Sequence, residues 1–162
     1  MINSASNKEK SVSRQSRRVY LDVSSLCRPF DDQNQLRIRL ETDAVQLISS
    51  NVRAKNLILV VSPAHDVEIA SIDDLAEREH LQLFLKQHGA RVAFDLSRAR
   101  QRAEELSKQG LGIADAAHLA YAEQAQADFV TCDDRLVRQC RRAGSRLWTG
   151  TPIAYCEKEN LR

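Results

Sequence analysis

The stretch "GIADAAHLAYAEQAQADFVTCDD", residues 112–134, carries a helix pattern followed directly by a strand pattern. Its first half is rich in small apolar residues, which predicts a helix that allows neighbouring backbones to approach closely. Asp115 lies in the first turn of this helix, and "DFVTC" predicts a buried strand followed by Asp133. A carboxylate on the inner side of such a helix needs protons, partners or a metal ion. The stretch therefore predicts a helix followed by a strand, and also a functional site formed by the carboxylates on these two elements.

The rest of the chain repeats this alternation of strands and helices. Parallel strands need crossover connections, and these connections put helices over both faces of the sheet. The pattern therefore predicts an α/β fold: a three-layer α/β/α sandwich with a central parallel sheet of four to five strands. The other expected strands are residues 18–22, 56–62, 91–95 and 146–148, and the other expected helices are residues 33–54, 63–71, 73–88, 96–109 and 135–143.

The length and composition favour a single domain. A chain of 162 residues with 43% hydrophobic residues can bury a sizeable core. We expect the domain to span residues 18–150, followed by an irregular C-terminal tail at 151–162. Residues 1–17 are polar and basic, which is typical of a disordered arm, although such an arm could also attract nucleic acid.

Several classes of protein are excluded by what the sequence lacks. There is no apolar leader and no run long enough to span a membrane, so we expect a cytoplasmic protein without a membrane partner. The four cysteines show no C-x-x-C pair, and the four histidines do not fall at zinc-ligand spacing.

Acids follow two of the predicted strands, and the carboxyl ends of parallel strands form a ligand site. If their strands are adjacent, Asp22 and Asp133 would share a crevice with Asp115 and with Glu68 from the helix after the second strand. Like charges at close range raise one another's pKa values, and a divalent cation removes this conflict. Oxygen ligands alone suit Mg²⁺ or Mn²⁺.

Each of these acids also has a simpler interpretation. Asp22 could close a turn, Asp133 could cap the next helix, and Asp115 could complement a helix dipole. Glu68 could lie on a solvated helix face, and Glu41 is more typical of one. For His118, one helical turn beyond Asp115, local packing or hydrogen bonding is favoured over metal binding.

Taken together, "VYLDVSSL", "VSPAHDVEIA" and the stretch at 112–134 resemble the PIN domain family of metal-dependent ribonucleases, whose bacterial members include toxins of toxin-antitoxin pairs. The resemblance covers about residues 18–150. It implies a metal site formed by four acids: Asp22, Glu68, Asp115 and Asp133. Glu41 is a competitor to Glu68 for the second of these positions. It also matches Ser24 and Thr131, which would orient the acids by hydrogen bonds, but here Val23 and Ser24 stand where many members have Thr and Asn.

The resemblance implies that the protein hydrolyses RNA phosphodiester bonds with Mg²⁺ or Mn²⁺ and leaves a 3′-hydroxyl and a 5′-phosphate. It also implies an antitoxin protein as a partner, and we expect a homodimer. Candidate contacts to RNA phosphates are Arg28, Arg135, Arg138 and Arg142. An ordinary solvated helix face explains the last three arginines equally well.

Three other classes of protein offer an alternative to this interpretation. Haloacid-dehalogenase-like phosphatases need D-x-D after the first strand, and the third position here is Ser24. Response-regulator receivers need a late lysine, and none lies between Lys108 and Lys158. A catalytically silent PIN-like module that binds RNA or an antitoxin stays open, although such a module has no need to concentrate negative charge where phosphates must approach.

Overall fold

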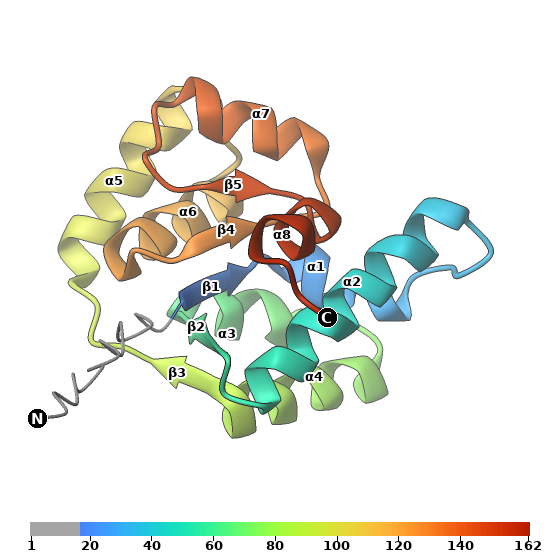
Figure 1. Ribbon diagram of the computed structural model, residues 1–162. Helices are drawn as coiled ribbons and strands as arrows, with labels where there is room; N and C mark the ends of the chain where they lie inside the picture. The colour runs from blue at the N-terminus through green and yellow to red at the C-terminus, as the bar shows by residue number, and fades with distance from the viewer. Residues whose placement is uncertain (1–16) are drawn as a thin grey trace, which may run out of the picture.

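A computed structural model describes residues 17–162, and most of the predicted basic arm, residues 1–16, lies outside the described residues. The five described strands form one parallel sheet in the order β3-β2-β1-β4-β5, which confirms the predicted sheet (Figure 1). The strands are β1 (Arg17–Leu21), β2 (Leu57–Val61), β3 (Gly89–Arg91), β4 (Asp128–Val130) and β5 (Thr149–Gly150).

Side chains alternate between the two faces of the sheet, so each face carries its own hydrophobic cluster. Val19 and Leu21 of β1 join one cluster, and Tyr20 joins the other. The first cluster is covered by α1 (Val23–Cys27), α2 (Leu36–Arg53), α4 (Leu75–His88) and α8 (Pro152–Glu159), and the second by α5 (Leu96–Lys108), α6 (Ile113–Ala125) and α7 (Asp134–Arg142). The predicted three-layer sandwich is therefore confirmed.

The C-terminal segment differs from the expected irregular tail. It forms helix α8, which begins at Pro152 after a Thr151 cap and packs against α2. Tyr155 of this helix is fully buried in the first hydrophobic cluster. A helix of eight residues is too short to be stable alone, so its tertiary contacts stabilise it. Arg17 was likewise assigned to the arm, but it lies in β1 and forms an ion pair with Glu159 of α8.

Two strands are displaced from their predicted positions. The last strand begins at Thr149 instead of 146, and β3 begins at Gly89, at the end of α4, two residues before the prediction. A Cβ atom on Gly89 would lie 2.3 Å from Val61 and 2.5 Å from the carbonyl oxygen of Leu85. Glycine therefore allows this close approach of strand and helix, a contact that sequence periodicity does not reveal.

The order of the strands decides where a ligand site can form. Beyond β1, the chain proceeds in one direction through β2 and β3, and then returns to the other side of β1 as β4 and β5. The reversal between β1 and β4 is a topological switch point, where α/β sheets bind ligands at the carboxyl ends of the strands. Asp22 follows β1 directly, and its backbone N–H donates to Val130 at the end of β4.

The short helix α3 (Pro63–Ala70) follows β2 and contacts α6 beside this edge of the sheet, while the 3-10 helix η1 (Arg28–Phe30) links α1 to the segment before α2. Among residues 17–162, no helix combines the length and the hydropathy that crossing a membrane requires.

Candidate metal centre

Asp22 is held rigidly at the switch point. Its side chain is buried, and it caps α1 by accepting a hydrogen bond from the backbone of Val23 at 2.8 Å. Its second oxygen accepts hydrogen bonds from Ser24 and Thr131, each at 2.9 Å. Ser24 of α1 and Thr131, which follows β4, therefore fix the orientation of Asp22. Despite these bonds, burial raises the pKa of Asp22 above its ordinary value.

Glu68 reaches the same point from α3. One of its oxygens lies 2.7 Å from Nε2 of His118 on α6, and Asp22, Glu68 and His118 each present a ligand atom within 4.8 Å of the others. The sequence favours packing or local hydrogen bonding of His118 over metal binding. In the structure the ring is fully buried, and its hydrogen bonds go to Tyr20 and Glu68 on two other elements. The spacing from Asp115 to His118 places both on one helix face, which was the available signal for a shared site.

Asp115 lies in the first turn of α6, and the charges of other acids affect its pKa. Its pKa is raised to about 6, first by partial burial and then by repulsion from Asp22, Asp133 and Glu68. Asp115 therefore lies near enough to these acids, which come from separate elements, for their charges to raise its pKa. A divalent cation would remove such repulsion, and Asp22, Glu68 and His118 could hold one.

Asp133 is exposed and caps α7. Its Oδ1 atom accepts hydrogen bonds from the backbones of Arg135 at 2.8 Å and Leu136 at 3.1 Å. The capping role considered from sequence is therefore present. It uses one carboxylate oxygen, and Asp133 is not among the described residues whose ligand atoms lie within 4.8 Å of one another, which are Asp22, Glu68 and His118.

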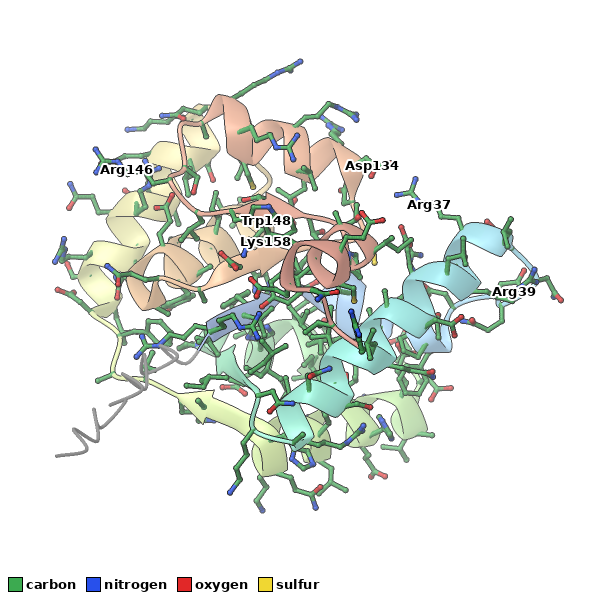
Figure 2. The ribbon with its side chains drawn as sticks, viewed as in Figure 1. Arg37, Arg39, Asp134, Arg146, Trp148 and Lys158 are labelled. Atoms are coloured by element: carbon green, nitrogen blue, oxygen red, sulfur yellow. The ribbon has the colours of Figure 1, made fainter. Side chains whose placement is uncertain are left out.

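Glu41 belongs to a different network. Its side chain is 2% exposed, and it forms ion pairs with Nε of Arg28 at 2.7 Å and with Nε of Arg37 at 2.8 Å. Arg37 also makes two hydrogen bonds to Asp134, at 2.8 and 2.9 Å (Figure 2). The expectation that Glu41 lies on a solvated helix face was wrong, because two arginines neutralise it in the interior.

The four candidate phosphate-binding arginines fall into two groups. Arg135, Arg138 and Arg142 are exposed on α7, and their side chains form no ion pair with any residue between 17 and 162. Arg28 differs, because its guanidinium is already paired with Asp31 and Glu41. The positive charge of Arg28 is thus already neutralised by acids of the protein itself.

The sheet order and this edge define a class: an α/β protein with an acidic site, suited to a divalent cation, at the switch point of a parallel sheet. The PIN domain family model matches residues 19–142, and the chain belongs to the PIN domain family. Members of this family are in general nucleases. The resemblance predicted from the sequence is therefore confirmed.

Two solved structures are similar to this chain at low sequence identity. The crystal structure of FitAcB from Neisseria gonorrhoeae is 16% identical, with a TM-score of 0.49, and the match covers 83% of this chain and 97% of that chain. The structure of FitAB bound to an IR36 DNA fragment is 14% identical, with a TM-score of 0.51, and the match covers 83% and 95% of the two chains. No curated protein matches the chain.

Proposed function

We propose that this protein is a Mg²⁺- or Mn²⁺-dependent endoribonuclease and the toxin of a toxin-antitoxin pair. The observation that carries the proposal is the convergence of acids at the switch point: Asp22 and Glu68 present oxygens within 4.8 Å of each other, and Asp115 is repelled by both. A binding module for RNA gains nothing from such a concentration of negative charge.

The proposed site has two kinds of residue, cation ligands and residues that orient them. The cation ligands, directly or through waters, are Asp22, Glu68, Asp115 and Asp133. Ser24 and Thr131 hold the buried carboxylate of Asp22 in a single orientation by hydrogen bonds. When bound, Mg²⁺ or Mn²⁺ supplies activation of a water molecule and neutralisation of charge on the phosphate. No side-chain nucleophile is needed.

We propose that α7 binds the RNA backbone. Arg135, Arg138 and Arg142 recur at helical spacing, and α7 begins directly after Asp133, so their charges lie on the helix that leads away from the acidic cluster. Arginines that contact phosphates position the substrate without reading its sequence. We leave Arg28 out of this proposal, because Asp31 and Glu41 already neutralise its guanidinium.

The test is cleavage of a labelled RNA by the purified protein. We expect cutting with Mn²⁺ or Mg²⁺, loss of cutting with a chelator, and products that carry a 5′-phosphate. Cleavage that persists in the chelator would contradict the metal role. Binding of RNA without cutting under either cation would instead support the silent PIN-like binding module.

The proposed toxin role adds an antitoxin protein as a partner and cytoplasmic RNA as the target. Expression in a bacterial host should then arrest growth, and co-expression of the antitoxin should restore it. Growth that is unaffected by an active nuclease would favour a housekeeping ribonuclease.

We further propose that the protein is a homodimer, joined through an apolar groove between α5 and α6. The groove has a volume of about 580 Å³, and it is lined by Leu96, Ala103 and Ile113, of which Ile113 is 86% exposed. Arg100 and Glu104 are one turn apart on α5 and line the groove. Two copies of α5 packed antiparallel would place Arg100 of each copy opposite Glu104 of the other, so the surface is complementary to itself.

Replacement of Ile113 by Asp is expected to convert the dimer to a monomer in sedimentation velocity at micromolar concentration, because it puts a charge into an apolar interface. The matched control is Leu83→Asp, which changes an exposed leucine of α4 outside the groove and should leave the dimer intact. A wild-type monomer, or an Ile113→Asp variant that still dimerises, would contradict this interface.

A further inference from the structure

We propose that His118 is a positioning residue that holds Glu68 by donating a hydrogen bond from Nε2, and that it is not a metal ligand. The proposal deepens the proposed function, on which its metal-binding part rests. Because His118 offers a ring nitrogen beside Asp22 and Glu68, direct ligation is the obvious alternative. The hydrogen bonds of the His118 ring and of the side chains bonded to it decide between positioning and ligation.

A chain of buried polar side chains leads from β2 to the acidic cluster. His65 lies 2.8 Å from the carbonyl oxygen of Leu21, and its Nδ1 accepts from the backbone N–H of Ser62 at 3.1 Å. The hydroxyls of Ser62 and Tyr20 are 2.6 Å apart, and the Tyr20 hydroxyl lies 2.6 Å from Nδ1 of His118. All four of these side chains are fully buried, so water does not compete for their hydrogen bonds.

The first end of the chain has one possible direction. A carbonyl oxygen only accepts, so Nε2 of His65 carries the proton that bonds to Leu21. A backbone N–H only donates, so Nδ1 of His65 carries none. Burial holds the pKa of His65 down to about 3, in agreement with this neutral ring. Nδ1 of His65 thus already has a donor, and the Ser62 hydroxyl lies nearer to the Tyr20 oxygen, at 2.6 Å, than to this nitrogen, at 3.4 Å.

The second end is constrained by Glu68. An ionised carboxylate only accepts, so Nε2 of His118 must carry a proton to make the 2.7 Å contact. This holds for the neutral ring, whose Nδ1 accepts from Tyr20, and equally for the doubly protonated ring. A nitrogen that carries a proton has no lone pair for a cation. His118 therefore fixes one oxygen of Glu68 and leaves the other oxygen for the metal.

This assignment keeps the proposed ligand set to oxygen. Ligation by imidazole would instead favour later transition metals such as Zn²⁺ over Mg²⁺. The chain from Ser62 through Tyr20 to His118 thus explains how a histidine beside two acids leaves the preference for Mg²⁺ or Mn²⁺ unchanged.

The tautomer can be measured on the metal-free protein by long-range ¹H–¹⁵N NMR. We expect a protonated Nε2 on His118 and an unprotonated Nδ1 on His65. Tyr20→Phe removes the hydroxyl that bonds to Nδ1 of His118 and should change the ¹⁵N shifts of His118. Tyr121→Phe, which changes a tyrosine on the same helix as His118, should leave these shifts unchanged. An unprotonated Nε2 on His118 in the wild type would overturn the proposal.

Metal binding gives a second, independent readout. In the Mn²⁺-loaded protein, electron spin echo modulation should show no directly coordinated nitrogen, and a coordinated imidazole would overturn the proposal. In calorimetric titrations with Mn²⁺, His118→Leu should weaken binding by about 10-fold to 100-fold. His118→Gln, whose amide can still donate to Glu68, should retain most of the affinity, and equal losses in both variants would contradict positioning.

These two experiments separate the proposal from the proposed function. A protein that binds no Mn²⁺ at all would refute the nuclease assignment and the metal-positioning role together. The tautomer measured without metal would still decide whether His118 donates to Glu68. A protonated Nε2 combined with normal Mn²⁺ binding supports both.

Discussion

Asp115→Asn is expected to reduce RNA cleavage by at least about a hundredfold while making the metal-free protein more stable at neutral pH. Loss of a residue that only orients a metal ligand costs about 10-fold to 100-fold, so loss of a proposed ligand should cost at least as much. The gain in stability arises because the change removes one of the mutually repelling carboxylates.

The pH dependence of this gain has a defined sign. The pKa of Asp115 is about 6 in the folded protein, against an ordinary value of 3.8. Below pH 3.8 the group is protonated in both the folded and the unfolded state, so it has no effect. Between these values the unfolded chain ionises first, so the wild type loses stability as the pH rises. Above pH 6 the full penalty remains, about 1 to 2 kcal/mol after solvent screening of a partly exposed group.

Denaturant unfolding at pH 4 and pH 8, without metal, measures this effect. Asp115→Asn should differ little from the wild type at pH 4, just above the ordinary pKa of 3.8, and should exceed it clearly at pH 8. Addition of Mn²⁺ should then stabilise the wild type more than the variant, because it binds the folded wild type more tightly. Asp43→Asn, at an exposed position of α2, is the matched control and should change neither cleavage nor stability. A variant with full cleavage activity would refute a ligand role for Asp115.

Glu41→Gln is expected to lower the free energy of unfolding by about 3 kcal/mol. The carboxylate is buried between Arg28 and Arg37, and its removal leaves the largely buried guanidinium of Arg28 with less compensation. The loss falls at the low end for a buried ion pair, because Arg28 keeps Asp31 and Arg37 keeps Asp134. For a domain of this size the melting temperature should fall by roughly 10 °C.

Thermal and denaturant unfolding check this prediction, with Glu105→Gln as the control. Glu105 pairs with Arg102 on the surface of α5, outside the proposed dimer groove, and an exposed ion pair contributes at most about 1 kcal/mol. Little change in the control beside a large loss in Glu41→Gln would support the buried network. Equal stability of the two variants would show that Glu41 does not hold α2 in place.

Measurements of stability, Mn²⁺ affinity and cleavage together distinguish the role of Glu41 from that of Glu68. Glu68→Gln should reduce Mn²⁺ affinity and cleavage with little loss of stability, since Glu68 is partly exposed and bonds only to His118 among the described side chains. Glu41→Gln should show the reverse. Loss of Mn²⁺ affinity in Glu41→Gln with unchanged stability would identify Glu41 as the ligand instead.

Local sequence patterns determined the fold class of this protein and the edge of the sheet at which its candidate site lies. The alternation of apolar strands with helices predicted the parallel three-layer fold, because crossover connections leave few other arrangements. Acids directly after strands predicted the edge at which a site forms, since Asp22 and Asp133 follow β1 and β4 along the chain itself. These features depend on residues that are near neighbours in the sequence.

Only the tertiary structure decided which side chains meet. Glu41 and Glu68 look alike in sequence, but Glu41 meets two arginines and Glu68 meets His118, 50 residues away. Arg37 and Asp134 are 97 residues apart, and α8 is stable through its contacts with α2. Periodicity reports which face of an element is buried, whereas the partner on that face depends on how distant elements pack together.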